Sequence, residues 1–162
     1  MSRTPGVEIH WHEAPRGDLR ELFLLAEDSP EQLDRYVNLG RVLVAVEDGA
    51  IVGHLQLVAC EEPEDLEDLE VRSLAVVETR QGHGIGRALV ERAVAEARAG
   101  GAGTLVVATA TADVGNLRFY QRLGFRMLRV ERDTFTASEG YPDGLVIDGI
   151  PLRDRIWLTL SL

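Results

Sequence analysis

The 162 residues are enough for one domain with a sizeable core, and we expect a single domain over 1–162. The net charge of -10 argues against nucleic acid as a partner, because phosphate backbones require clustered Lys and Arg. No apolar run approaches the ~20 residues that span a bilayer, and the single cysteine, Cys60, cannot form a disulfide within the chain. We therefore expect a cytoplasmic protein with no nucleic-acid or membrane partner.

Periodicity and turn signals divide the chain into strands and helices. The expected elements, in chain order, are a strand at 7–12, helices at 18–26 and 30–39, two strands within 41–60, a strand at 69–77, a helix at 84–101, a strand at 104–110, a helix at 113–123, and strands at 125–135 and 155–162. This order is typical of a mixed α/β domain. A long connection, 134–154, precedes the last strand, and connections of that length are usually functional or mobile.

Local signals support several of these elements. Ser29 is a candidate N-cap, and Pro30 follows it at the first position of the helix. Asp48 and Gly49 separate two apolar, β-branched runs, which predicts a two-residue hairpin turn. In 84–101 apolar residues recur every four positions, as on one face of a helix.

Three glycines in alternate positions, Gly82, Gly84 and Gly86, stand where the helix at 84–101 begins. The first turn of a helix has unpaired N–H groups and a partial positive charge, and glycines let a bulky anion approach them. A strand, a glycine-rich turn and a helix start therefore form a phosphate cradle. The chain has no Gly-Lys-Ser/Thr triplet of a Walker loop, and its spacing also fails the dinucleotide pattern G-x-G-x-x-G/A.

The remaining pattern, Gln81-x-x-Gly84-x-Gly86 after "LAV", resembles the pyrophosphate-binding motif of the GCN5-related N-acetyltransferase family. A second landmark, "NLRFYQRLGF" (116–125), is similar to the tyrosine-bearing helix of that family and the Leu-Gly-Phe that follows it. The resemblance covers roughly 42–125. It implies a mixed, mostly antiparallel central sheet flanked by helices, with acetyl-CoA as cosubstrate and no metal.

In that family acetyl-CoA lies in a V-shaped opening between the fourth and fifth strands. The resemblance implies that Leu74, Ala75 and Val76 offer main-chain groups to the pantetheine and the acetyl carbonyl. It also implies that main-chain N–H groups of the next segment hold the pyrophosphate. That segment comprises Gln81, Gly82, His83, Gly84, Ile85, Gly86 and Arg87. We expect His83 to be an exposed loop residue rather than a base.

Two residues match catalytic positions of the family. Tyr120 corresponds to a tyrosine near the coenzyme sulfur, where a hydroxyl with an ordinary pKa near ~10 can protonate the leaving thiolate. The alternative is a tyrosine that only packs on its helix face. Glu70, four residues before Leu74, matches a glutamate base of some members, which takes the ammonium proton directly or through water. Because Glu70 also ends the acidic run "EEPEDLEDLE", we slightly favour a solvated strand end.

The sequence departs from the family at one coenzyme contact. The family usually has Asn seven residues before the tyrosine, and Asp113 occupies that position here. Asp accepts hydrogen bonds and caps helices, but it cannot donate as an amide does. Asn116 lies one turn further on. The resemblance therefore brings a coenzyme contact to Asp113 or Asn116 without deciding between them.

Other polar residues carry weaker signals. His10 and His12 point to one face of the first strand, but the spacing indicates no third ligand, so we expect no metal site. We expect His54 to be a partly buried polar residue of the third strand. The acidic run at 61–70 either attracts a cationic acceptor or is a charged loop. The connection at 134–154 is expected to lie near the acceptor entrance and to shape acceptor specificity.

The function that these observations imply is an acetyl-CoA-dependent N-acetyltransferase in which a neutral amine attacks the thioester directly. The acceptor is a small-molecule or peptide amine that the sequence does not name. A non-catalytic acyl-CoA-binding module on the same scaffold and a transferase for a longer acyl chain remain as alternatives. Because dimers are common in the family, a homodimer is also expected.

Overall fold

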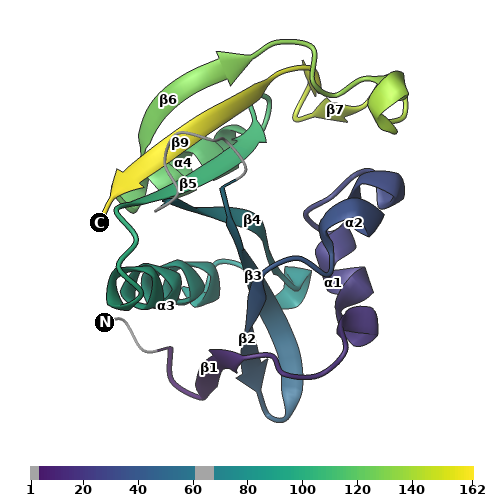
Figure 1. The fold of residues 1–162 in the computed structure, drawn as a ribbon. Coiled ribbons are helices and arrows are strands. Elements are labelled where there is room, and N and C mark those ends of the chain that lie inside the picture. The colour runs from purple at the N-terminus through teal and green to yellow at the C-terminus, as the bar shows by residue number, and fades with distance from the viewer. Residues whose placement is uncertain (1–3, 61–67) are drawn as a thin grey trace.

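The computed structural model describes residues 4–60 and 68–162. Its main feature is a seven-stranded sheet in which only β4 and β5 run parallel, while every other neighbouring pair is antiparallel (Figure 1). The strands, in their spatial order, are β1 (Val7–Trp11), β2 (Arg41–Glu47), β3 (Ala50–Ala59), β4 (Asp68–Val76), β5 (Thr104–Ala110), β9 (Arg155–Ser161) and β6 (Arg126–Glu131). The predicted mixed, mostly antiparallel sheet is confirmed.

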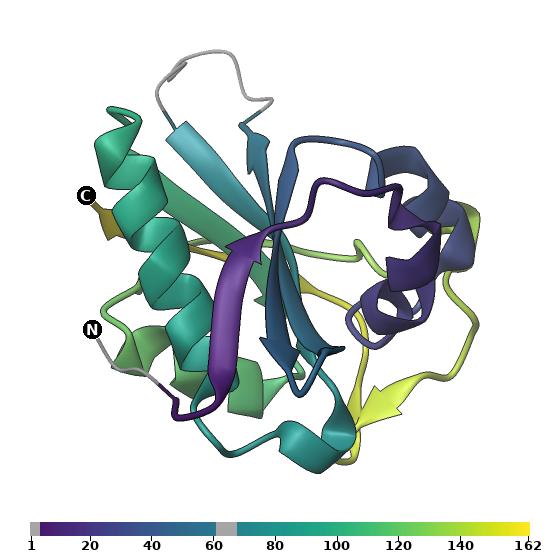
Figure 2. The ribbon, with the colours of Figure 1, turned by 90° about the horizontal axis from the view of Figure 1, so that it is seen from below.

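Helices cover both faces of this sheet. They are α1 (Arg20–Leu24), α2 (Pro30–Tyr36), α3 (Ile85–Ala99) and α4 (Val114–Arg122), with 3-10 turns η1 (Arg16–Leu19), η2 (Glu78–Arg80) and η3 (Ala137–Glu139). Helices α1 and α2 lie on one side of the sheet and α3 on the other (Figure 2). Leu89 of α3 and Tyr120 of α4 share one buried cluster, whereas Phe23 and Leu33 belong to a second cluster beneath α1 and α2. None of the helices in the described ranges is long and apolar enough to cross a membrane.

Local turn and cap signals are confirmed. Ser29 caps α2 by accepting a hydrogen bond from the main-chain N–H of Gln32 at 3.2 Å, and Pro30 is the first helical residue. Asp48 and Gly49 join β2 to β3 with φ values of 50° and 80°, in the left-handed region that a two-residue hairpin turn of this type requires.

The two N-terminal helices are shorter than expected. The segment 18–26 is divided between η1 and α1, and α2 ends at Tyr36 instead of Leu39. After Tyr36 the chain turns more tightly, since Leu39 N–H donates to Tyr36 O at 2.9 Å, and Gln56 fixes this turn by donating to Tyr36 O at 2.7 Å and to Leu39 O at 2.9 Å. Tertiary contacts therefore end the helix before its sequence pattern does.

The connection at 134–154 contains structure that periodicity does not reveal. A small hairpin pairs β7 (Val146–Ile147) with β8 (Ile150–Pro151), and two-residue strands are too short for an alternation signal. Its turn is again Asp-Gly, Asp148 and Gly149, with φ values of 49° and 80°. The connection reaches α2, where the Gln32 side chain donates to Glu139 O at 2.8 Å.

Candidate functional site

The parallel strands β4 and β5 are hydrogen-bonded over their first halves only. Residues 68–71 pair with 104–107, and the two strands then separate. The register of β4 against β3 skips Arg72, so a bulge lies where the separation begins. Beyond it, 73–76 stay paired with β3 and 108–110 stay paired with β9. The result is a V-shaped opening in the middle of the sheet.

A cavity of about 980 Å³ occupies this opening. We refer to the part lined by Gly84, Gly86, Asn116, Phe119 and Tyr120 as the helix end. The part lined by Glu27, Tyr36, Phe135, Tyr141 and Leu152 is the loop end. All but one of the predicted site residues line the cavity, and they are Glu70, Leu74, Ala75, Val76, Gln81, Gly82, Gly84, Ile85, Gly86, Arg87, Asp113, Asn116 and Tyr120.

Helix α3 presents an unpaired first turn to the helix end. Gly82 and Gly84 have φ values of 77° and 83°, in the region that favours glycine, and Gly84 is the N-cap. The first carbonyl bond of the helix runs from Ala88 N to Gly84 O at 3.0 Å. The N–H groups of 85–87 precede it and have no helical partner. No acidic residue lies in this turn, so it suits an anion.

Side chains fix the shape of the turn before α3. Gln81 Nε2 donates to Val76 O at 3.0 Å, so Gln81 closes the turn and occupies one of the predicted main-chain contacts. A Cβ at Gly86 would lie 3.5 Å from the Phe119 ring, which is ordinary contact distance between α3 and α4. His83 is the one predicted residue that does not line the cavity. It is exposed, and its Nδ1 lies 2.9 Å from Gln81 O.

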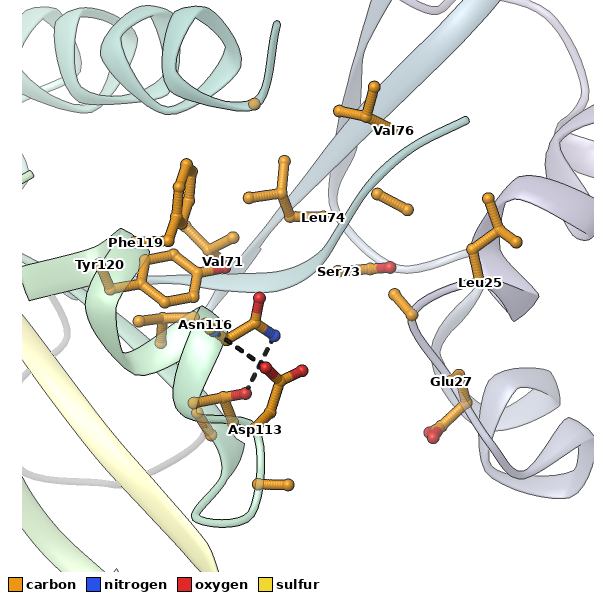
Figure 3. Close-up of a pocket in the computed structure, with 18 of the residues that line it drawn as sticks. Leu25, Glu27, Val71, Ser73, Leu74, Val76, Asp113, Asn116, Phe119 and Tyr120 are labelled. Atoms are coloured by element: carbon orange, nitrogen blue, oxygen red, sulfur yellow. Dashed lines mark hydrogen bonds between the residues drawn. The ribbon is translucent and has the colours of Figure 1, made fainter. Parts of the chain in front are cut away.

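Tyr120 is buried at the helix end, between Phe119 and Phe125 at ring-centre distances of 5.0 and 5.5 Å. Its hydroxyl points toward β4 and the opening (Figure 3). Burial, assisted by the negative charge of Asp113, raises the pKa of Tyr120 above that of an ordinary tyrosine. The expectation of an ordinary pKa is therefore wrong. The hydroxyl stays protonated at neutral and moderately alkaline pH, as a hydrogen-bond donor must.

Glu70 lies on the wall of the cavity and is only 7% exposed. The favoured interpretation, a solvated strand end, is therefore wrong. Arg72 Nη1 approaches Glu70 Oε1 at 3.4 Å, and the Arg72 guanidinium lies 4.4 Å from the centre of the Tyr36 ring. A carboxylate held at the bulge, beside the opening, can accept a proton from a group bound there.

Ser73 and His54 form a buried pair that the sequence analysis missed. Ser73 Oγ lies 2.8 Å from His54 Nε2, and Ser73 lines the cavity. His54 is fully buried, not partly as expected, and its ring lies 4.1 Å from that of Phe23. Burial lowers the pKa of His54 to about 3, so the imidazole is neutral at physiological pH.

The position of the imidazole proton follows from the second nitrogen of His54. Its Nδ1 is buried and has no hydrogen-bond partner within 4–60 and 68–162. Because an orphaned buried N–H is rarer in proteins than an orphaned acceptor, we assign the proton to Nε2. His54 then donates to Ser73 Oγ. The hydroxyl proton of Ser73 is left to donate into the cavity.

Asp113 and Asn116 have different roles at the start of α4. Asp113 is the N-cap and accepts from the main-chain N–H of Asn116 at 2.9 Å, as expected of an aspartate there (Figure 3). The side-chain amide of Asn116 donates to Thr109 Oγ1 of β5 at 3.2 Å. Both residues line the cavity. Asp113 caps the helix, and the hydrogen bond to Thr109 holds the amide of Asn116 in place.

The loop end contains a half-buried carboxylate, Glu27, in the α1–α2 loop. Tyr141 of the 134–154 connection donates to Glu27 Oε2 at 3.2 Å, and the Phe135 ring packs edge-on to Tyr141 at 5.0 Å. Burial raises the pKa of Glu27, whereas hydrogen bonds from Tyr141 and the main chain of Ser29 and attraction to Arg72 oppose this rise. Neither Glu27 nor its hydrogen bond to Tyr141 is indicated by a motif or a spacing in the sequence.

The other candidates do not assemble into a site. His10 Nδ1 lies 3.2 Å from Trp11 O and His12 Nε2 lies 3.3 Å from Pro15 O, so the two imidazoles do not converge. Over 4–60 and 68–162 no group of three His, Cys, Asp or Glu side chains can hold a metal ion. Most of the acidic run at 61–70 lies outside the described residues.

Comparison with known proteins gives matches over most of the chain. The model of the acetyltransferase (GNAT) family matches residues 7–125. A GNAT family acetyltransferase from Elizabethkingia anophelis, solved with acetyl-CoA bound, is 32% identical with a TM-score of 0.86 and covers 98% of this chain and 99% of its own. An acetyltransferase of Bacillus subtilis, solved in complex with CoA, is 29% identical with a TM-score of 0.85. The match covers 96% of this chain and 99% of that protein. The uncharacterized N-acetyltransferase YvbK of Bacillus subtilis (strain 168) is 29% identical over 156 residues, 96% of this chain and 97% of that protein.

Proposed function

We propose that this chain, which belongs to the acetyltransferase (GNAT) family, transfers the acetyl group of acetyl-CoA to a primary amine. The observation that carries the proposal is the opening between β4 and β5, with the unpaired first turn of α3 and the Tyr120 hydroxyl beside it. The similar proteins from Elizabethkingia anophelis and Bacillus subtilis were solved with acetyl-CoA and CoA, which supports the same coenzyme here.

The helix end has the properties that the coenzyme requires. The N–H groups of 85–87, after Gly82 and Gly84, suit the negative charge of the pyrophosphate. His83 contributes only its main chain, and Gln81 acts by closing the turn. Main-chain groups of 74–76 face the pantetheine and the acetyl carbonyl in this proposal. Asn116 and Asp113 flank the same opening, and no metal takes part.

The chemistry is direct attack of a neutral amine on the thioester. The amine nitrogen forms a bond to the acetyl carbon, and the carbon–sulfur bond breaks. Glu70 takes a proton from the acceptor ammonium, directly or through water, before the attack. As the intermediate collapses, the Tyr120 hydroxyl gives a proton to the departing thiolate, and the attacking nitrogen loses its second proton to water. Solvent later restores both groups. Main-chain N–H groups of β4 polarise the carbonyl as charge develops on its oxygen.

Turnover with a panel of primary amines tests this proposal. Free thiol is followed in solution, and the product is identified by its mass. We expect thiol release that requires both acetyl-CoA and an amine, an amide product, and no acetylated protein when acetyl-CoA is present alone. Binding of acetyl-CoA without amine-dependent thiol release would instead support the non-catalytic binding module. An acetylated protein that passes its acetyl group to an amine would contradict direct attack.

The proposal also covers domain organisation, cellular location and oligomeric state. We propose that 1–162 acts as one domain in the cytoplasm, and that it forms a homodimer. Three apolar side chains of the edge strand β6 support the dimer, since Met127, Leu128 and Val130 are each more than half exposed. Sedimentation of the purified protein tests it. A single monomeric species at micromolar concentration would contradict it.

A further inference from the structure

Glu27 stands apart from the groups that perform the proposed chemistry. Tyr120 and Glu27 lie on opposite sides of the cavity, with Ser73 between them (Figure 3). Glu27 belongs to the α1–α2 loop, whereas Glu70 belongs to β4 beside the opening. A carboxylate on the far side of the cavity is not placed to take a proton from the reacting nitrogen.

The charges at the loop end leave Glu27 without an ion pair. Arg72 is within salt-bridge distance of Glu70, at 3.4 Å, and Arg155 of Glu131, at 4.0 Å. Within 4–60 and 68–162, no Lys, Arg or His lies within salt-bridge distance of Glu27, although Arg72 attracts it from further away. A half-buried carboxylate without a cation is unfavourable, and a bound cation relieves this cost.

Hydrogen bonds hold the Glu27 carboxylate in place without neutralising it. The Tyr141 hydroxyl donates to both oxygens, at 3.2 and 3.4 Å. Burial and the neighbouring Glu27 raise the pKa of Tyr141, which keeps this hydroxyl a donor. Tyr36 and the main chain of Ser29 also donate to Glu27. A carboxylate accepts about four hydrogen bonds, so a position remains for an N–H group of a ligand. An ammonium group is the donor that also supplies the missing charge.

The walls of the loop end suit an aliphatic stem. Leu25, Leu152 and the ring of Phe135 line this part of the cavity, and Tyr36 adds a second ring. Methylene groups pack favourably against such surfaces. The exposed Asp28 also lines the cavity and adds negative charge to its wall. Cationic acceptors are thus attracted before they bind.

From this arrangement we propose that the acceptor is an aliphatic diamine or polyamine. Its second ammonium group binds the Glu27 carboxylate, while its free primary amine reaches the opening between β4 and β5. The inference rests on the proposed function and adds the acceptor class to it. Glu27 is a specificity-determining residue in this account, and Tyr141 positions it.

Three acceptors of equal chain length test the proposal with acetyl-CoA as donor. They are cadaverine with two amines, pentylamine with one amine, and δ-aminovalerate with one amine and one carboxylate. We expect kcat/KM for cadaverine to exceed that for pentylamine at least about tenfold, because one charge-assisted hydrogen bond contributes this much. δ-Aminovalerate should be the poorest acceptor, since its carboxylate meets Glu27.

Two variants test whether the preference for cadaverine depends on the Glu27 carboxylate. Glu27→Gln keeps the size and the hydrogen bond from Tyr141 but removes the charge, so the preference for cadaverine should fall to within about twofold. Glu21→Gln is the matched control, because Glu21 is exposed on α1 and does not line the cavity. The KM for acetyl-CoA should be unchanged in both variants. A preference that survives in Glu27→Gln would overturn the assignment.

Binding to the protein–CoA complex separates this inference from the proposed function. Calorimetry with CoA in excess measures cadaverine affinity without any reaction, and we expect tighter binding than for pentylamine in the wild type only. If cadaverine binds in this way but no amine releases thiol, the transferase proposal fails and the cation site stands. Equal affinity for the two amines, or no binding of cadaverine, would overturn the inference even if other amines are acetylated.

Discussion

The helix end of the cavity is built mainly from one continuous stretch, 74–87, together with one face of α4. The loop end instead joins side chains from the α1–α2 loop, from α2 and from the 134–154 connection. At the helix end, main-chain N–H groups and glycine conformations make the site. At the loop end, a carboxylate and aromatic rings do so. One end is suited to a constant coenzyme and the other to an acceptor that differs between proteins.

The largest expected effect comes from breaking the helix end alone with Gly84→Glu. Gly84 has a φ of 83°, and a carboxylate there would face the pyrophosphate, where like charges cost several kcal/mol. We expect acetyl-CoA affinity to fall at least about a hundredfold. Acetyl-CoA should then raise the melting temperature of the wild type but not of the variant.

Gly84→Ala is the control for backbone strain. A Cβ at this position has room, since its nearest neighbour would be Thr4 Oγ1 at 3.6 Å. The alanine variant should therefore retain more affinity than the glutamate variant. Equal losses in both would mean that conformation, and not anion binding, is what Gly84 provides.

The second effect concerns chemistry rather than binding. Tyr120→Phe removes the buried hydroxyl, and general acid catalysis of this kind contributes about a hundredfold to kcat. The KM for acetyl-CoA should change little, because the hydroxyl acts on the leaving thiolate. Steady-state kinetics at saturating acceptor measures both. Unchanged kcat with weakened coenzyme binding would make Tyr120 a binding residue instead.

The glycine turn and the tyrosine helix could be predicted because their signals are local. Gln81, Gly84 and Gly86 lie within six residues of one another at the start of α3. Asp113 caps α4 by accepting a hydrogen bond from the main-chain N–H of Asn116, three residues later. The order along the chain of the strands that form the main sheet also followed, since alternation and hairpin signals mark them. These features depend on spacing along the chain, which a single sequence displays.

The 134–154 connection was expected near the acceptor entrance, but the side-chain contacts of the loop end could not be predicted because they join distant residues. Glu27 and Tyr141 are separated by 114 positions, and neither lies in a motif. The His54–Ser73 pair depends on the register of β3 against β4 and on the bulge at Arg72, which no periodicity reports. Burial of Glu70 was missed for a related reason. The acidic run suggested solvent, but the fold places its last residue against the cavity.

The third effect concerns the buried His54, which pairs with Ser73 between the two ends, and it appears in the pH dependence of stability. The folded pKa of His54 is lowered to about 3 from 6.5, so below pH 6.5 the unfolded chain binds a proton that the folded chain does not. Stability from this group is complete above pH 6.5 and falls by about 1.4 kcal/mol per pH unit below it.

Urea unfolding at pH 7 and pH 5 measures this loss. The decrease in unfolding free energy between these pH values should be about 2 kcal/mol smaller in His54→Gln than in the wild type. His10→Gln is the control, because His10 is exposed on β1 and should leave the difference unchanged. If His54→Gln has the same pH dependence as the wild type, the imidazole is not buried as a neutral group.

The smallest effect is expected at Tyr141. Tyr141→Phe removes the hydrogen bond to Glu27 but keeps the ring and the carboxylate, so the KM for cadaverine should rise only about threefold to tenfold. The KM for acetyl-CoA should not change, since Tyr141 lies at the loop end. Kinetics with each substrate varied in turn measures both constants. A change in the coenzyme KM alone would contradict the separation of the two ends.

Calorimetric titration of the wild-type protein with acetyl-CoA tests the central claim most directly. The opening between β4 and β5, with its unpaired helix start, predicts one site per chain with a dissociation constant in the micromolar range. Such binding would make the helix end a coenzyme site, and the acceptor experiments would follow from it. A folded wild-type protein that binds no acetyl-CoA would contradict the account and leave only the fold of the family.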